Sequence, residues 1–268
     1  MSDRMHIQVA DGVADVRLNR PEKLNALDPA MFEALVGTGR ELATDPSLRA
    51  VVLSGEGRGF CAGLDFASFM GMGGLHGGGG ERLAARETGA AVNFAQRAAW
   101  VWAELPVPVI AAVHGVAFGG GLQIALAADL RLVTPDARLS VMEIRWGLIP
   151  DMSGTQTLRH LVRLDVAKEL TFTGRIVSGE EAVALGLATR VEESPREAAL
   201  AMARQIAGRS PNAIRAAKRL LNTTVASSQE EGFRLEESIQ RSLIGSPNQL
   251  EAVQANLEKR APRFVDPD

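Results

Sequence analysis

The chain has 268 residues, of which 46% are hydrophobic and 23% charged, and its net charge at pH 7 is −3. This length allows one large domain with a full hydrophobic core, and the charge gives no general attraction to nucleic acid or acidic lipid. No apolar run reaches the roughly 20 residues that span a bilayer, so we expect neither nucleic acid nor a membrane as a partner. The polar N-terminus and the single cysteine predict a cytoplasmic protein.

Alternating apolar and polar residues predict two strands at the start of the chain. The segments HIQVA (6–10) and VADVRL (13–18) stand on either side of Asp11-Gly12. An Asp-Gly pair between two alternating runs is typical of a hairpin turn. The chain is therefore expected to open with a β-hairpin.

Helical and strand patterns then follow in turn. Asp28 can cap a helix, Pro29 suits its first turn, and Asp45-Pro46 ends the helical spacing. Short, mainly apolar segments that predict buried strands lie at residues 49–55, 107–115 and 129–134. Strands that alternate with helices predict an α/β fold with a mainly parallel sheet.

The composition changes after residue 193. Four consecutive helical patterns occupy residues 195–210, 211–224, 227–245 and 247–260, and three of them open with proline. We therefore divide the chain into an α/β core, residues 1–193, and a helical C-terminal region, residues 194–268. The segment Gly71–Gly80 is too rich in glycine to hold one conformation alone, and it reads as a mobile surface loop or as a lid near a site.

Two glycine-rich turns follow buried strands. One contains Gly119, Gly120 and Gly121 directly before a helical pattern, and the other spans residues 54–66. Glycines at a helix start let a ligand oxygen reach backbone N–H groups, although close packing of the helix on the sheet would also require them. Two such turns could supply two N–H donors to one oxygen, as in an oxyanion hole.

These turns and other segments resemble the crotonase family, the enoyl-CoA hydratase/isomerase enzymes. The matching segments are LNRPEKLNAL, GRGFCAGLDF, HGVAFGGGLQIALAADLRL, LSVMEIRWGLIPDMSGTQTL, FTGRIVSGEEAVALGLATRV and NLEKRAPRF. The resemblance implies a spiral of ββα repeats with a helical C-terminal oligomerisation region, and a homotrimer or dimer of trimers. It also implies an acyl-CoA thioester substrate, whose carbonyl is held by the backbone N–H groups of Leu64 and Gly120.

The acid–base residues depart from the hydratases of that family, which use two glutamates. The second is present as Glu143, but the first position is filled by Gln123, and an amide cannot exchange protons at neutral pH. Asp151 follows in the same motif and reads either as the N-cap of a helix that begins near Met152 or as a second acid. The resemblance to dienoyl-CoA isomerases favours the second reading, although those enzymes carry an aspartate where this chain has Gln123.

The resemblance also suggests contacts for coenzyme A, which enters as part of the substrate, so no separate cofactor is expected. Backbone groups near Lys23, Ala26 and Ala62 would hold the adenine end, with Arg20 and Lys23 offering charge to phosphates. Lys259 and Phe264 would come from a neighbouring subunit. The residues expected to shape the acyl pocket are Phe66, Phe69, Met70, Trp146 and the Gly71–Gly80 segment.

Four scattered histidines and one cysteine show no metal-ligand spacing, so no metal is expected. Cys61 has no base near it in the sequence and reads as a packed side chain rather than a nucleophile.

Several activities remain open from the sequence. Glu143, with Gln123 as an orienting group, could add water to an enoyl-CoA or shift its double bond, and Glu143 with Asp151 could serve a dienoyl-CoA isomerase. Gln123 also allows a non-catalytic acyl-CoA-binding protein, against which Glu143 and Asp151 argue. Dehalogenation would need a histidine beside a nucleophilic aspartate, and no histidine stands at a matching place.

Overall fold

The computed structural model describes residues 3–70 and 78–267, and the strands of these residues form two sheets. The larger sheet has the strand order β1-β2-β3-β4-β6-β9. Its strands are β1 (Met5–Ala10), β2 (Val13–Leu18), β3 (Ala50–Gly55), β4 (Val109–Val113), β6 (Leu130–Val133) and β9 (Arg190–Val191). The first two form an antiparallel hairpin that pairs Met5 with Leu18, and the later neighbours are parallel. The predicted hairpin and mainly parallel sheet are confirmed.

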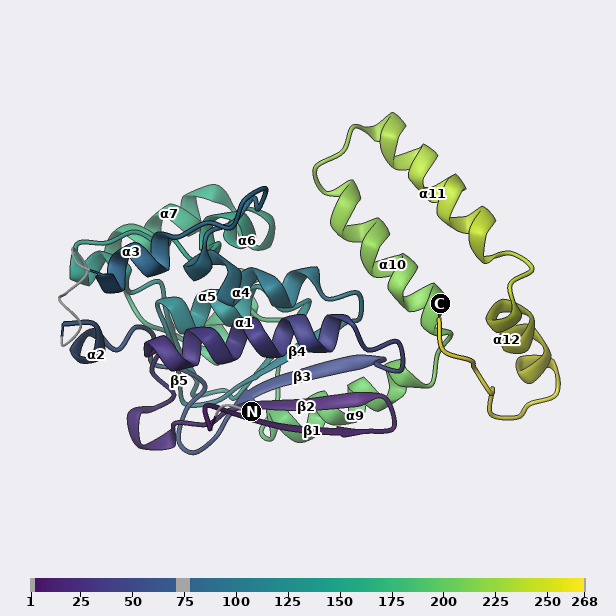
Figure 1. The fold of residues 1–268 in the computed structure, drawn as a ribbon, viewed down its shortest axis with the longest axis horizontal. Coiled ribbons are helices and arrows are strands. Elements are labelled where there is room, and N and C mark those ends of the chain that lie inside the picture. The colour runs from purple at the N-terminus through teal and green to yellow at the C-terminus, as the bar shows by residue number, and fades with distance from the viewer. Residues whose placement is uncertain (1–2, 71–77, 268) are drawn as a thin grey trace.

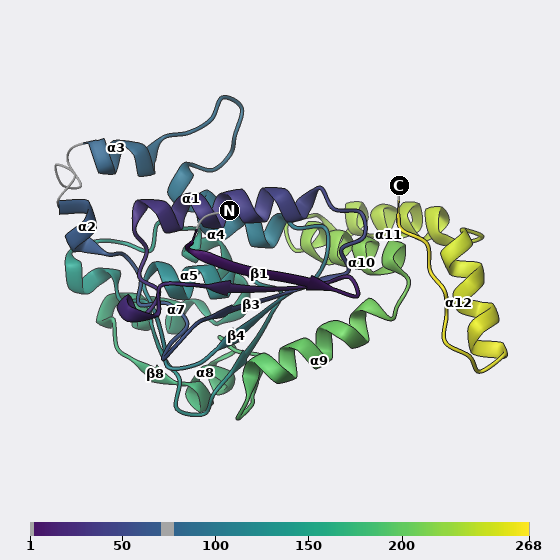
Figure 2. The same cartoon turned by 60° about the horizontal axis from the view of Figure 1, so that its bottom comes forward.

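Helices cover both faces of this sheet. From β3, Val51 and Leu53 enter the core that contains α1 (Pro29–Ala43) and α4 (Phe94–Glu104). The alternate residues of β3 enter a second core together with α9 (Pro195–Ala207). Figure 2 shows α1 and α9 on opposite sides of the sheet. Because both faces are buried, the central strands appear in the sequence as uninterrupted apolar runs.

A smaller sheet joins β5 (Val116–Phe118), β7 (Arg138–Ser140) and β8 (Val177–Ser178). These strands have two or three residues each, which is too short for a hydrophobic period to show in the sequence. The other helices around the two sheets are α2 (Phe66–Met70), α3 (Gly78–Ala84), α5 (Gly120–Leu126), α6 (Gly154–Leu161), α7 (Leu164–Thr173) and α8 (Gly179–Leu185), with the short 3-10 helices η1 (Pro21–Lys23) and η2 (Glu143–Trp146).

Only the last three residues of the glycine-rich segment Gly71–Gly80 are described by the structure. Residues 71–77 lie outside the described residues, so the prediction of a loop or lid cannot be compared there. Gly78, Gly79 and Gly80 form the first turn of α3, although the sequence predicted no fixed conformation for them.

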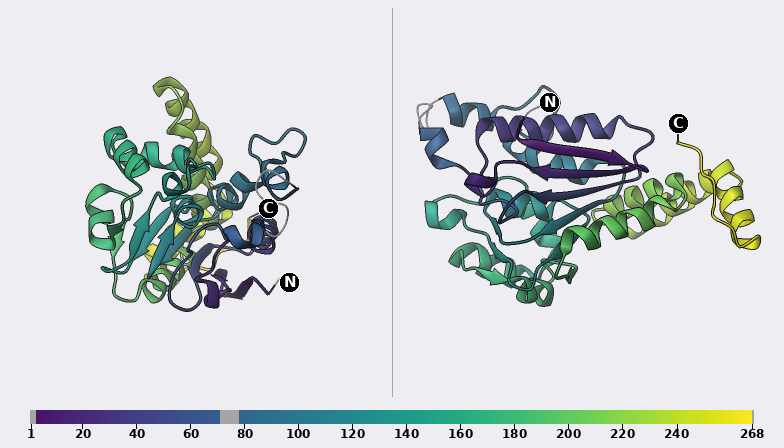
Figure 3. Two further views of the ribbon diagram at one scale, coloured as in Figure 1. Left: turned by 90° about the vertical axis from the view of Figure 1, so that its left-hand side faces the viewer. Right: turned by 90° about the horizontal axis from the view of Figure 1, so that it is seen from below.

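The C-terminal quarter is helical, as predicted. After α9 come α10 (Pro211–Thr224), α11 (Gln229–Leu243) and α12 (Pro247–Leu257), which project beyond the sheet (Figures 1 and 3). Lys218 of α10 ties this region to the core: its Nζ lies 2.8 Å from the carboxylate of Asp129 and donates to the carbonyl of Val107. Among the described helices, none is long and apolar enough to cross a bilayer.

Candidate active site

The two glycine-rich turns lie side by side, as expected. Cys61 and Ala117 form a parallel bridge, in which the N–H of Cys61 donates to the carbonyl of Val116 and that of Phe118 to the carbonyl of Cys61. A Cβ placed on Gly63 would lie 2.7 Å from the carbonyl oxygen of Phe118 and 3.7 Å from the backbone nitrogen of Gly120. The end of the first turn therefore meets the start of α5.

The glycines of the second turn serve two needs. Gly119 has φ of +52°, which disfavours any residue with a Cβ. A Cβ on Gly121 would lie 2.4 Å from the carbonyl oxygen of Cys61, so this glycine permits close packing between the two turns. Within residues 3–70 and 78–267, no acceptor takes the N–H of Leu64 or Gly120. Both residues line a cavity, so two N–H donors are available there.

This cavity has a volume of about 340 Å³ and a mainly apolar wall. Phe66 and Trp146, both expected in the pocket, line it with their ring centroids 4.4 Å apart and their planes tilted by 33°. The side chains of Phe69 and Met70 lie outside the described part of the structure. The polar side chains in the described wall are Asn93, Gln123, Glu143 and Asp151. Apolar residues of the wall that were not expected from the sequence to shape the pocket include Phe32, Leu83, Met142, Leu148 and Met152.

Glu143 is the first residue of η2, and it is only 8% exposed. Its Oε1 accepts a hydrogen bond of 2.5 Å from Nε2 of Gln123, whereas its buried Oε2 has no partner among the described residues. Burial raises the pKa of this carboxyl, and the charge of Asp151 adds to the effect, while the bond from Gln123 opposes it. Glu143 thus brings to the cavity wall a buried carboxyl whose proton affinity is raised and whose Oε2 has no partner among the described residues.

The side-chain amide of Gln123, a residue of α5, is fixed by hydrogen bonds at both its nitrogen and its oxygen. In addition to the bond from Nε2 to Glu143, its Oε1 accepts from the backbone N–H groups of Met152 and Gly154, each at 2.8 Å. Gly154 begins α6, so the glutamine oxygen satisfies donors that a helix start leaves unpaired. Gln123 therefore connects Glu143 to the beginning of α6.

Asp151 lines the same cavity, but it does not cap α6. The N-cap position belongs to Ser153, which has φ of +70° and makes no side-chain capping bond. The interpretation of Asp151 as a helix cap is therefore wrong, because Gln123 takes the N–H groups that such a cap would accept. The surrounding protein raises the pKa of Asp151 by desolvation, although the residue is exposed at the cavity wall.

The expected coenzyme A contacts fall into two groups. Lys23 is exposed at the end of η1, and Ala26 donates to its carbonyl oxygen. Ala62 lies at the cavity wall and donates to the carbonyl of Leu24, so this group lies together near the two turns. Lys259 and Phe264 follow α12, and neither is among the described residues that line the cavity. Figure 1 shows α12 far from α2 and α5.

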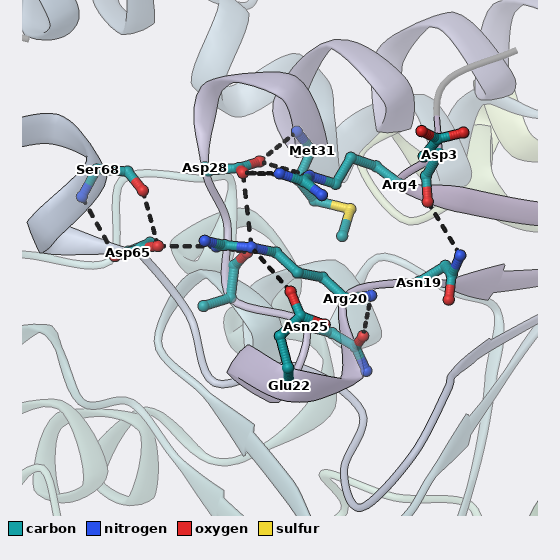
Figure 4. A network of polar contacts seen from close by, with 11 residues as sticks. Asp3, Arg4, Asn19, Arg20, Glu22, Asn25, Asp28, Met31, Asp65 and Ser68 are labelled. Atoms are coloured by element: carbon teal, nitrogen blue, oxygen red, sulfur yellow. Dashed lines mark hydrogen bonds and ion pairs between the residues drawn. The ribbon is translucent and has the colours of Figure 1, made fainter.

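Arg20 and Cys61 are buried and contact other protein groups rather than the cavity. Arg20 was expected to offer charge to a phosphate, but it is only 8% exposed and its guanidinium contacts Asp65 and Asp28 (Figure 4). That expectation is not supported, because both carboxylates already neutralise the cation. Cys61 is fully buried and donates to the carbonyl of Asn25. Burial raises the pKa of its thiol to about 12, so the thiol is protonated at neutral pH.

Comparison with known proteins identifies the family. Residues 8–267 match the family model of enoyl-CoA hydratase/isomerase. The mitochondrial methylglutaconyl-CoA hydratase of Mus musculus is 32% identical over 260 residues, which cover 94% of this chain and 79% of that protein. The mitochondrial enoyl-CoA hydratase domain-containing protein 2 of Mus musculus is 33% identical over 264 residues, with coverage of 95% and 84%.

A solved structure agrees with the sequence comparison. The enoyl-CoA hydratase from Bacillus anthracis superposes with a TM-score of 0.88 at 32% identity, and covers 97% of this chain and 98% of that one. The two sheets and the C-terminal helices accordingly form the α/β crotonase fold, as the sequence resemblance implied. The chain is an enzyme of the enoyl-CoA hydratase/isomerase, or crotonase, family, whose members bind acyl-CoA.

Proposed function

We propose that the enzyme acts on the double bond of an enoyl-CoA thioester, with hydration as the first candidate reaction. One arrangement carries the proposal: Leu64 and Gly120, whose N–H groups have no acceptor among the described residues, line the same cavity as Glu143. The thioester carbonyl accepts from both N–H groups, which stabilise the negative charge of an enolate. Relatives whose names describe hydratases, matched over nearly the whole chain, support hydration.

Glu143 is the principal proton carrier in this proposal. The bond from Gln123 fixes the orientation of the carboxyl, whose Oε2 has no partner among the described residues, and the carboxyl exchanges the proton with water and the substrate carbon. Gln123 itself orients the carboxyl and moves no proton. In hydration, the hydroxyl group of a water molecule joins C3 and a proton joins C2 of the enolate.

Double-bond isomerisation is the second candidate, and a specific observation favours it. Gln123 cannot act as the second acid, whereas Asp151 lines the same cavity with a raised pKa. A carboxylate removes a proton from one carbon, the oxyanion hole holds the enolate or dienolate, and a carboxyl returns a proton to another carbon. The dienoyl-CoA isomerase alternative assigns these two steps to Glu143 and Asp151.

The test is mass spectrometry of short enoyl- and dienoyl-CoA thioesters after incubation with the enzyme in deuterium oxide. Addition of one heavy water supports hydration, and deuterium uptake or a shifted double bond without water supports isomerisation. Binding without any exchange at the α-carbon would favour a non-catalytic acyl-CoA-binding protein instead.

Replacement of the proposed proton carrier gives a sharper test. We expect Glu143→Gln to lower kcat by about 10²–10⁴-fold, the usual contribution of a positioned general acid or base. Glu41→Gln, at an exposed position of α1, is the matched control and should keep wild-type kcat. Near-wild-type turnover by Glu143→Gln would remove Glu143 from the proposed mechanism.

The remaining proposals concern assembly and coenzyme A. We propose that Lys23, Ala26 and Ala62 contact the coenzyme, and that Lys259 and Phe264 of a neighbouring copy complete its site in a homotrimer or dimer of trimers. The division into a core (1–193) and a helical region (194–268) and the cytoplasmic location are also proposals, the latter supported by the lone, buried and protonated Cys61.

A further inference from the structure

The backbone of Leu64 is held from one side by the segment that precedes α1. The N–H of Leu27 donates to the carbonyl of Gly63 at 2.8 Å, and the N–H of Asp65 donates to the carbonyl of Leu27 at 3.0 Å. In this parallel bridge the two neighbours of Leu64 face Leu27, so the N–H of Leu64 points away from it. The direction of this N–H therefore depends on where Leu27 and Asp65 are fixed.

One guanidinium group joins both of these places. Nη1 of Arg20 lies 2.8 Å from Oδ2 of Asp65 and donates to the carbonyl of Ala26 at 3.1 Å, next to Leu27. Nε of Arg20 lies 3.6 Å from Oδ2 of Asp28. Figure 4 shows the guanidinium between the two carboxylates. Arg20 thus contacts both segments that form the Leu27–Leu64 bridge.

Both carboxylates also fix the start of a helix beside the cavity. Asp28 accepts from the N–H of Met31 in the first turn of α1, and Asp65 accepts from the N–H and the hydroxyl of Ser68 in α2. These helices supply Phe32 and Phe66 to the cavity wall. The carboxylates are largely buried, with 9% and 11% of their side chains exposed. Asp28 also contacts Arg4, so loss of the Arg20 cation would leave mainly the charge of Asp65 poorly solvated.

The loop between Arg20 and Asp28 needs such support. Leu24 and Asn25 have φ of +49° and +57°, which residues with side chains adopt only when their surroundings enforce it. The Asn25 side chain accepts from the N–H of Arg20 and donates to the carbonyls of Glu56 and Gly59. Because two residues of this loop have unfavourable φ values, we expect its backbone conformation to change when the contacts of Arg20 are lost.

We propose that Arg20 is a positioning residue, which fixes the N–H of Leu64 by joining Asp65 and Asp28 across the Leu27–Leu64 bridge. This inference rests on the proposed function of Leu64 as an oxyanion donor. Arg20 lies behind the described cavity wall rather than in it, so it acts through Leu64 and does not touch the substrate.

The test compares three variants. Arg20→Lys keeps the charge but loses the planar group that reaches two carboxylates and a carbonyl. Asp65→Asn keeps an acceptor for Ser68 but removes the charge that faces Arg20. Arg4→Lys is the matched control, because Arg4 also forms a forked contact with Asp28, from another side.

Three readouts separate positioning from general stability. The first readout is kcat and KM. The second is the absorbance of bound 2,4-hexadienoyl-CoA, which shifts to longer wavelength when the thioester carbonyl accepts hydrogen bonds. The third is hydrogen exchange in the peptide spanning residues 61–68. We expect Arg20→Lys and Asp65→Asn to lower kcat at least tenfold with KM within twofold, to reduce the absorbance shift and to speed exchange. Arg4→Lys should match the wild type in all three.

Two outcomes would overturn the inference: wild-type values for Arg20→Lys and Asp65→Asn, or equal losses in Arg4→Lys. If the wild-type enzyme neither turns over nor shifts the absorbance, the proposed function fails. The exchange comparison still decides whether Arg20 fixes the Leu64 backbone, because it needs no ligand.

Discussion

The carboxyl group of Glu143 combines burial with an oxygen that no described protein donor contacts. Its pKa in the folded protein is raised above the ordinary value of 4.5, mainly by burial. The folded state therefore binds this proton more tightly than the unfolded chain does. Stability is lost as the pH rises from 4.5 through the raised pKa, and the loss is complete above it. The proposed proton carrier thus destabilises the fold at neutral pH.

Glu143→Gln should consequently raise the melting temperature at pH 8 while it lowers kcat. Glutamine keeps an oxygen to accept from Gln123 and removes the buried charge. In a chain of this size each kcal/mol corresponds to about 2–4 °C. Melting curves at pH 5 and pH 8 should show a gain that grows with pH, and Glu41→Gln should show none. A lower melting temperature at pH 8 would contradict this account.

Gln123→Glu tests how the two positions interact. It would place a second carboxyl where an amide now lies 2.5 Å from Glu143, and two carboxylates at such a distance cannot both ionise easily. We expect the acid limb of the kcat profile to move to higher pH. Water addition, measured with heavy water as above, should rise relative to isomerisation. An unchanged pH profile would show that residue 123 does not sense the charge of Glu143.

Some of these residues could be identified from the sequence and others could not. Leu64, Gly120, Gln123 and Glu143 stand in continuous motifs, and the structure gathers them at one cavity. Asp151 was ambiguous because its capping role depended on the N–H groups of α6, and Gln123, from a distant part of the chain, takes them. The burial of Arg20 likewise depends on Asp65, 45 positions later, and no local sequence pattern predicts that contact.

At the scale of elements, the long helices and strands could be predicted from the sequence and the short ones could not. The 15-residue α1 and its Asp28 cap show both a periodicity and a start signal, and the four C-terminal helices do so as well. The strands of the small sheet have at most three residues, so only their pairing defines them. The start of α6 lacks a side-chain cap, because Gln123 replaces it from outside.

Close packing between α5 and the neighbouring turn gives an element-scale prediction. A Cβ on Gly121 would meet backbone and Cβ atoms of Cys61, whereas a Cβ on Gly120 would meet the flexible ends of Met152 and Leu27. We expect Gly121→Ala to reduce the free energy of unfolding by about 1–3 kcal/mol, and Gly120→Ala by less.

Gly37 provides the matched control for that series. It lies in α1, and a Cβ there would meet nothing within 4 Å. Gly37→Ala should therefore raise the free energy of unfolding by about 0.5–1 kcal/mol through helix propensity. Urea denaturation measures all three variants, and a Gly121→Ala protein as stable as the wild type would refute close packing as the reason for that glycine.

At the scale of the whole molecule, the helices after residue 193 differ in how they bury their apolar residues. Ala199 and Ala203 of α9 are fully buried on the sheet. The projecting helices α10, α11 and α12 instead leave large apolar side chains exposed, including Leu221 at 66%, Phe233 at 60% and Leu257 at 80%. Exposed apolar residues concentrated on a projecting region are typical of a surface that another chain covers.

Self-association through α10–α12 is therefore the last prediction. Light scattering after size exclusion should give a mass that is a multiple of 28.5 kDa, with three copies as the smallest assembly. Phe233→Asp combined with Leu221→Asp should lower that mass, because two charges would have to be buried in the interface, while circular dichroism stays unchanged. Val9→Asp, at an exposed position of edge strand β1, controls for surface charge. If coenzyme A contacts come from a neighbouring copy, the double variant should also raise KM more than it lowers kcat. A wild-type protein that is monomeric in solution would contradict both the predicted assembly and the shared coenzyme A site.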